Sequence, residues 1–129
     1  MRLTVGLILA LSLEELGVTR EEWEATCGKV GRLTKRLARP GQLATWLAHR
    51  NTSASITAIG RKLGRNHTTV LYTLKSMPKI LATEPDIARA AKRIEERIDR
   101  LAALPADSAE ARALLPQPGK WTQPAEARP

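Results

Sequence analysis

Residues 55–77 read SITAIGRKLGRNHTTVLYTLKSM, and this stretch decides the fold. The first half begins after the capping residue Ser55 and carries apolar residues at the three-to-four spacing of a helix. Gly64 ends that helix, and Asn66 or a neighbour caps a second one that continues to Met77. Two short helices joined by a tight glycine turn are typical of a helix-turn-helix. Gly60, inside the first helix, marks a place where a neighbouring helix approaches closely.

The start of the second helix carries side chains that suit the reading of DNA bases. In a helix-turn-helix the second helix enters the major groove, led by its N-terminal residues. Arg binds guanine bidentately, Asn binds adenine, and a Thr methyl contacts the thymine methyl. Asn66 also suits an N-cap, and capping and base reading are compatible. The residues predicted to read bases are Arg65, Asn66, His67 and Thr68.

Positive charge is concentrated in the middle of the chain. The 129 residues carry a net charge of +8, whereas residues 25–83 alone hold eleven bases and no acid. A surplus confined in this way indicates a polyanionic partner, and we predict double-stranded DNA and no membrane partner. Three bases beside the two helices are placed to contact the DNA backbone, namely Arg61, Lys62 and Lys75.

The remaining composition favours helix and argues against several kinds of site. There is no Phe and only one Tyr, which disfavours RNA-binding folds that stack bases on aromatic platforms. The single Cys27 excludes an internal disulfide and is best read as a small apolar filler. Cys27, His49 and His67 show no metal-ligand spacing, so we predict no metal and no cofactor.

The N-terminal half is predicted to hold three helices. Leu3 to Leu13 is an apolar run that resembles a short signal-peptide core, but no small-x-small cleavage site follows it. We therefore predict a buried helix from about Thr4 to Leu16, ended by Gly17. A second helix follows the cap Thr19 and runs to about Leu37, either whole or broken at its glycines. A third has Pro40 in its first turn.

The C-terminal half is predicted to hold one more long helix and a tail. Pro78 should end or kink the recognition helix, and a last helix runs from about Asp86 to Leu104. Residues 1–104 then form a single all-α domain, and residues 105–129 form a flexible, Pro- and Ala-rich tail with a short helix over Asp107 to Leu115. Trp121 in this tail is either an anchor for a protein partner or an incidental residue.

Three strings of the sequence resemble one known family. They are IGRKLGRNHTTVL at residues 59–71, RPGQLATWLA at residues 39–48 and LGVTRE at residues 16–21. Together they resemble the C-terminal DNA-binding domain of DnaA, the bacterial replication initiator, over roughly residues 5–101. The resemblance implies that Asn66, His67 and Thr68 read bases of the DnaA box. It adds Thr69 as a phosphate or base contact, and it places the minor-groove and backbone role among Arg32, Lys35, Arg36 and Arg39.

The sequence also departs from the family pattern. Asn66 stands where the family usually has Asp; a carboxylate only accepts hydrogen bonds, whereas an amide also donates. The turn has one glycine where two are common, and Gly41 stands where a basic residue usually follows the proline. The string G-x-x-x-x-G-K-[ST] does not occur in these residues, so we expect no ATP-driven remodelling by them.

We therefore predict a cytoplasmic, nucleoid-associated bacterial protein that binds DnaA-box-like DNA and is not an enzyme. The leading role is a transcriptional regulator from a phage or a phage-derived element. A protein that recognises DNA sequence but lacks an ATPase can recruit or block other proteins, but it cannot remodel DNA. A replication-control factor at DnaA boxes, or an adaptor that tethers a partner through its tail, are the alternatives. No acidic cluster suited to two metal ions lies in the folded region, which disfavours a recombinase-like enzyme.

Overall fold

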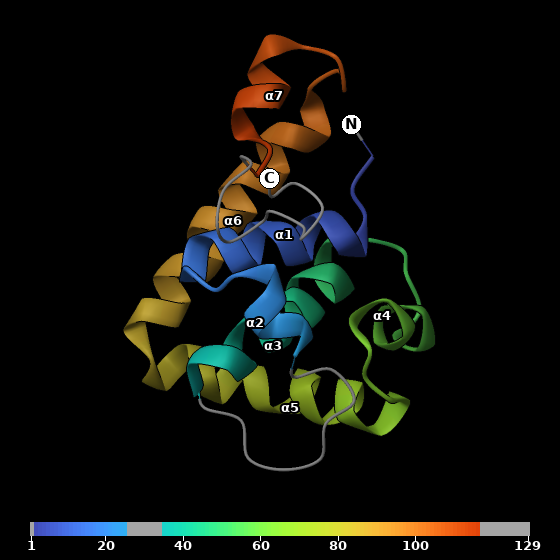
Figure 1. Ribbon diagram of the computed structural model, residues 1–129, viewed down its shortest axis with the longest axis vertical. Coiled ribbons are helices and arrows are strands. Elements are labelled where there is room, and N and C mark those ends of the chain that lie inside the picture. The colour runs from blue at the N-terminus through green and yellow to red at the C-terminus, as the bar shows by residue number, and fades with distance from the viewer. Residues whose placement is uncertain (1, 26–34, 117–129) are drawn as a thin grey trace.

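The computed structural model of the protein describes residues 2–25 and 35–116. Within these two ranges the chain is helical and contains no strand (Figure 1), which confirms the predicted all-α fold class. The helices are α1 (Val5–Leu16), α2 (Arg20–Glu24), α3 (Lys35–Asn51), α4 (Ile56–Leu63), α5 (His67–Thr83), α6 (Pro85–Ala103) and α7 (Ala109–Leu114). None of these helices is long and apolar enough to cross a membrane.

Helix α1 lies in the middle of the molecule and is covered on several sides. The Thr4 hydroxyl accepts a hydrogen bond from the Leu7 backbone N–H at 3.1 Å, and Gly17 ends the helix with a left-handed φ of 67°. Leu11 and Leu13 are fully buried. Helices α3, α4 and α6 pack against α1 (Figure 1). The predicted buried first helix is therefore confirmed.

Helices α4 and α5 form the predicted helix-turn-helix. The Ser55 hydroxyl accepts a hydrogen bond from the Ala58 backbone N–H at 3.1 Å. Gly64 adopts a left-handed φ of 67° at the turn. The Asn66 side-chain oxygen accepts from the Thr69 backbone N–H at 2.8 Å, which caps α5. Each of these three roles was predicted from the sequence, and each is confirmed.

Gly60 allows the turn to close tightly onto α4. The Arg65 backbone N–H donates to the Gly60 carbonyl oxygen at 2.8 Å. A Cβ atom on Gly60 would lie 2.6 Å from the Arg65 carbonyl oxygen and 3.2 Å from Cγ2 of Val70. The first contact is with backbone, which cannot rotate aside, so this position requires glycine. The sequence predicted that a neighbouring helix approaches Gly60; the closest approach is made by the turn at Arg65, followed by the Val70 side chain of α5.

Two prolines lie inside helices that extend beyond their predicted bounds. Pro40 lies inside α3, because the helix begins at Lys35 rather than near the proline. The extra turn is held by tertiary ion pairs of its arginines, which no local pattern reveals. Pro78 does not end α5, which continues to Thr83 because apolar residues beyond the proline, including Ile80, pack against the core. The recognition helix is thus longer than the predicted 66–77.

Helix α2 is a short piece of the predicted second helix. Thr19 and Glu22 form a capping box, in which the Thr19 hydroxyl accepts from the Glu22 backbone and the Glu22 carboxylate accepts from the Thr19 backbone. The helix ends at Glu24, and Trp23 within it is buried. Residues 26–34 of the predicted helix, together with Cys27, lie outside the described residues.

Helix α6 closes the core with one apolar face, as its sequence predicted. It begins at Pro85, one residue before the expected start, and ends at Ala103. It packs against α1, α3 and α5. Its buried residues are Ile87, Ala90, Ala91, Ile94, Ile98 and Leu101.

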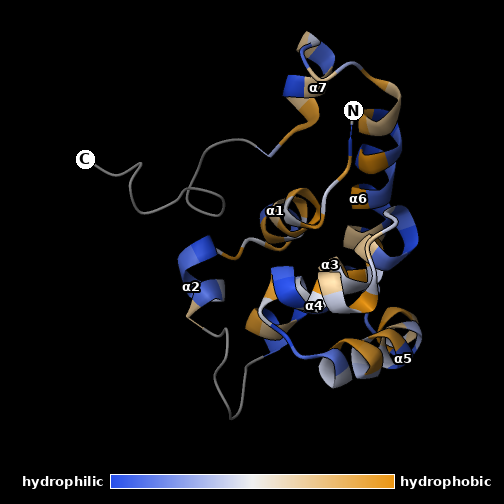
Figure 2. Cartoon of the chain, turned by 90° about the vertical axis from the view of Figure 1, so that its right-hand side faces the viewer, coloured by the Kyte–Doolittle hydropathy of each residue, from blue (hydrophilic) through white to orange (hydrophobic). Residues whose placement is uncertain are grey.

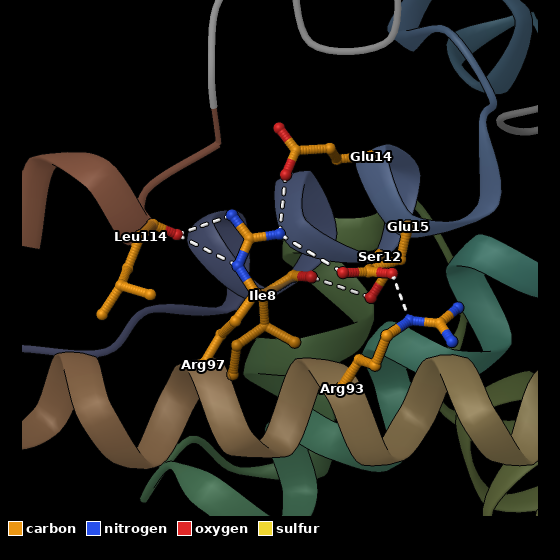
Figure 3. Close-up of polar contacts among 7 residues, drawn as sticks. All are labelled: Ile8, Ser12, Glu14, Glu15, Arg93, Arg97 and Leu114. Carbon is orange, nitrogen blue, oxygen red and sulfur yellow. Dashed lines mark hydrogen bonds and ion pairs between the residues drawn. The ribbon is translucent and has the colours of Figure 1, made fainter.

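Arginines on α6 connect α1 to the short α7 (Figure 3). The Arg97 guanidinium donates to the Leu114 carbonyl oxygen at 2.6 and 3.1 Å and to the Glu14 carboxylate at 2.6 Å. One turn earlier, Arg93 donates to the Glu15 carboxylate at 2.9 Å. One side chain, Arg97, therefore satisfies a carboxylate of α1 and a backbone carbonyl at the end of α7.

Helix α7 consequently packs against α6, and the predicted boundary at residue 105 between the domain and a flexible tail stays a prediction. The short helix predicted over Asp107 to Leu115 is confirmed as α7, and its Ala111 is fully buried. Trp121 lies outside the described residues. Helix α5 lies at the end of the molecule opposite α7 in both views (Figures 1 and 2).

The close approach at Gly60 leads to a prediction about stability. Gly60→Ala should lower the free energy of unfolding by about 1–3 kcal/mol, because the new methyl group pushes the turn away from α4. The matched control is Gly6→Ala, since a Cβ there meets nothing nearer than the Thr4 hydroxyl oxygen at 4.0 Å. That control should raise stability by up to about 1 kcal/mol through helix propensity. Equal effects of the two substitutions in urea unfolding followed by circular dichroism would contradict the prediction.

Candidate nucleic-acid interface

The first turn of α5 presents polar side chains to solvent. His67, Thr68 and Thr69 are exposed, as is the cap Asn66. The cap uses only the amide oxygen of Asn66, and its amide nitrogen carries two donors that the cap does not use. These residues stand at the leading end of the second helix of a helix-turn-helix, which is the end that enters a major groove.

The exposed side of α5 continues beyond its first turn. A helix turns by about 100° per residue, so Thr68, Tyr72, Lys75 and Lys79 lie along one side. All four are exposed. On the opposite side Val70, Thr73 and Met77 are buried against the core. The long α5 therefore offers a polar and basic face at the edge of the molecule.

Three further predicted contacts flank this face or lie beside the turn. Arg61 and Lys62 are exposed in the last turn of α4. The Arg65 guanidinium stacks over the Trp23 ring of α2, 5.4 Å from the ring centroid, and bonds the Gly64 carbonyl at 3.4 Å. Arg65 is thus held toward α2 in the free protein, while Asn66, His67 and Thr68 share the leading edge of α5.

The basic residues in the first turns of α3 differ in their surroundings. Lys35 is exposed. Arg36 donates to the Glu22 carboxylate at 2.7 and 3.1 Å and keeps about half of its side chain exposed, 53%. Arg39 is 12% exposed and bonds Glu84 at 2.5 and 3.1 Å. Arg39 also donates to the Gln42 side chain at 2.6 Å, and Arg32 lies outside the described residues.

Both carboxylates that pair with these arginines are held ionised. The hydrogen bond from Arg36, followed by that from the Thr19 backbone, lowers the pKa of Glu22 from 4.5 to about 2. The same bond raises the pKa of Arg36. The hydrogen bond from Arg39 likewise lowers the pKa of Glu84. Glu22, two residues before the last acid ahead of the acid-free stretch, and Glu84, the first acid after it, are therefore used in holding the framework of α3.

A small crevice adjoins the exposed face of α5, and the sequence did not predict it. It has a volume of about 150 Å³ and lies between the first half of α3 and the start of α5. Among residues 2–25 and 35–116, no acid lines it; its polar or positively charged lining residues include Gln42, Arg65, Thr69 and Tyr72. Tyr72 was also missed, although its position four residues after Thr68 is the available signal.

The Glu22–Arg36 pair makes stability depend on pH. Because the folded pKa of Glu22 is lowered, its contribution is fully present above pH 4.5 and is lost as the pH falls toward 2. Glu22→Gln and Arg36→Gln should each reduce the slope of unfolding free energy against pH in this window, measured by urea unfolding at each pH. The double variant should flatten the slope no further, and an additive effect of the two changes would count against the pairing.

Comparison with known proteins places most of this surface in one family. Residues 14–77 match the family model described as the bacterial dnaA protein helix-turn-helix, a shorter span than the predicted resemblance over residues 5–101. Two similar relatives are both named chromosomal replication initiator protein DnaA. That of Caulobacter sp. (strain K31) is 35% identical over 68 residues, which cover 52% of this chain and 14% of the relative.

The second relative carries the same name and aligns with a longer part of this chain. The protein of Anaplasma marginale (strain St. Maries) is 34% identical over 86 residues, which cover 66% of this chain and 17% of the relative. The chain therefore spans less than a fifth of the length of either relative. Residues 14–77, which contain α4, the Gly64 turn and α5 as far as Met77, belong to the bacterial DnaA helix-turn-helix family.

Proposed function

We propose that the protein binds double-stranded DNA with sequence preference and inserts the start of α5 into the major groove. The observation that carries this proposal is the capped, exposed leading edge of α5, where His67 and Thr68 face solvent. It stands in a stretch of the sequence, residues 25–83, that holds eleven bases and no acid. Bases read at the leading edge then supply selectivity, and phosphate contacts around it supply affinity.

Affinity in this proposal comes from exposed cations on several elements. Arg61 and Lys62 flank the turn, Lys75 follows on α5, and Lys35 stands at the start of α3. Each such contact to a phosphate releases condensed counterions, so binding should weaken steeply as salt is added. The Thr69 hydroxyl and the first backbone N–H groups of α5 add uncharged donors at the helix start.

Arg36 and Arg39 take different roles in this proposal. Arg39 is nearly buried in its pair with Glu84 and acts as a brace between α3 and the start of α6. Arg36 bonds both oxygens of the Glu22 carboxylate but keeps about half of its side chain exposed, so a phosphate can reach it and replace that carboxylate. Of the two, Arg36 is the backbone or minor-groove contact that we propose.

The biological role that we propose is regulation of transcription at DnaA-box-like sites, in a phage or a phage-derived element. The region related to DnaA is a DNA-reading unit, and bound at a promoter it blocks or recruits polymerase. Control of replication at the same sites is the second candidate, and the relatives' name, chromosomal replication initiator protein, favours it. Either role places the protein on bacterial DNA in the cytoplasm. A partner at Trp121 stays a prediction.

The division between selectivity and affinity can be tested by titration. The target is the duplex that the protein selects from a random DNA pool. His67→Ala should weaken binding to that duplex by about 1–3 kcal/mol and leave binding to a scrambled duplex unchanged. Lys35→Ala should weaken both about equally and reduce the salt slope by about 1. If neither substitution alters the Kd measured by fluorescence anisotropy, α5 and the start of α3 are not the DNA-binding surface.

Replacing Asn66 by Asp separates capping from base reading. Aspartate caps a helix about as well as asparagine, so Asn66→Asp should leave thermal stability nearly unchanged. A carboxylate accepts from a cytosine amine, whereas an amide binds adenine through both donor and acceptor. Selection from a random pool with this variant should therefore change the preferred base at one position of the site. An unchanged site would assign Asn66 to capping alone.

A further inference from the structure

Tyr72 is unusual among the large apolar side chains of the protein. Within the ranges that the structure describes, the exposed large hydrophobic residues are Leu71 and Tyr72, which are 38% and 70% exposed. Both lie on α5, the helix that we propose enters DNA. Exposed apolar surface that gathers on one functional element indicates a contact that the isolated molecule does not make.

The position of Tyr72 on α5 defines which part of DNA it meets. It lies four residues after Thr68, which is about 6 Å farther along the helix and about 40° around it. It lies three residues after Thr69, and both line the crevice between α3 and α5. Tyr72 therefore stands one turn behind the leading edge, toward the side of α5 where α3 borders it, and not at the centre of the exposed face.

We propose that Tyr72 is a further DNA-contacting residue, whose ring packs on a deoxyribose and whose phenolic hydroxyl donates to a phosphate oxygen of the strand next to the crevice. The inference rests on the proposed function, because it assumes that the start of α5 occupies the major groove. A side chain one turn behind the base-reading edge meets the wall of the groove, which is sugar and phosphate. Tyrosine hydroxyls are among the side-chain groups that bind phosphate oxygens in protein–DNA complexes.

The electrostatic setting supports a phosphate at this place. The described residues that line the crevice include Arg65 and no acid. Gln42 and Thr69 add amide and hydroxyl donors from α3 and α5. A phosphate near Tyr72 would therefore meet hydrogen-bond donors and positive charge.

An uncharged contact to phosphate can be distinguished by titration from a base-reading contact and from a lysine contact. Because it carries no sequence information, its loss weakens selected and scrambled duplexes alike. Because it carries no charge, its loss leaves the slope of log Kd against log salt unchanged. Loss of a base-reading side chain weakens the selected duplex more than the scrambled one, and loss of a lysine contact changes the salt slope.

The experiment measures Kd by anisotropy for the full chain with a selected and a scrambled duplex at several salt concentrations. Tyr72→Phe, which removes only the hydroxyl, should weaken binding to both duplexes by roughly 3- to 10-fold. Tyr72→Ala should weaken both further, and neither variant should alter the salt slope. Lys75→Ala is the matched control on the same face and should lower the slope by about 0.9. His67→Ala controls for base reading.

A direct readout is available because Tyr72 is the single tyrosine of the sequence. Protein labelled with fluorotyrosine gives one fluorine resonance, which should shift when the duplex is added and stay fixed when only the protein concentration rises. A concentration-dependent shift would assign the ring to contact between two copies and overturn the proposal. So would wild-type affinity of Tyr72→Ala, or a loss confined to the selected duplex. If the wild-type chain binds neither duplex, the proposed function itself fails.

Discussion

The contact between Gly60 and the turn that follows α4 is the constraint on which the DNA-facing surface depends. The Arg65 carbonyl oxygen comes so close that no Cβ fits at Gly60, and the Arg65 N–H bonds the Gly60 carbonyl. This contact sets the angle at which α5 leaves the turn. The angle places Val70 in the core and turns His67 and Thr68 outward. The orientation of the leading edge is therefore a consequence of backbone packing.

Two groups of basic side chains have different physical roles: some form ion pairs within the fold, and others are exposed around α5. Arg39 and Arg97 are largely buried; Arg39 pairs with Glu84 at the junction of α5 and α6, and Arg97 pairs with Glu14 of α1. These pairs hold α3, α6 and α1 in place, and breaking one would leave a poorly solvated charge. The lysines and arginines around α5 are exposed, and their stretch of sequence offers no carboxylate. Glu22 and Glu84, which lie outside this stretch, pair with arginines of α3.

Several features were predictable because the interactions that create them are local. Thr4, Ser55 and Asn66 each precede a helical pattern and accept a bond from a backbone N–H three residues ahead. The apolar spacing of α6 likewise predicts its buried face. The start of α3 and the end of α5 were predicted wrongly for the opposite reason. A proline raises the local free energy of a helix, and contacts with distant residues outweigh that cost in α3 and α5.

The sequence by itself determined the helical fold class, the caps, the turn at Gly64 and the acid-free basic stretch, because each depends on neighbouring residues or on composition. Only the tertiary structure decided which basic side chains form ion pairs within the fold and which remain exposed to solvent. Arg39 and Lys35 look alike in the sequence, yet one is held by Glu84, forty-five residues away, and the other faces solvent. The exposure of Tyr72 beside a crevice was also decided there. Burial depends on which helices meet, and that information is distributed over the whole chain.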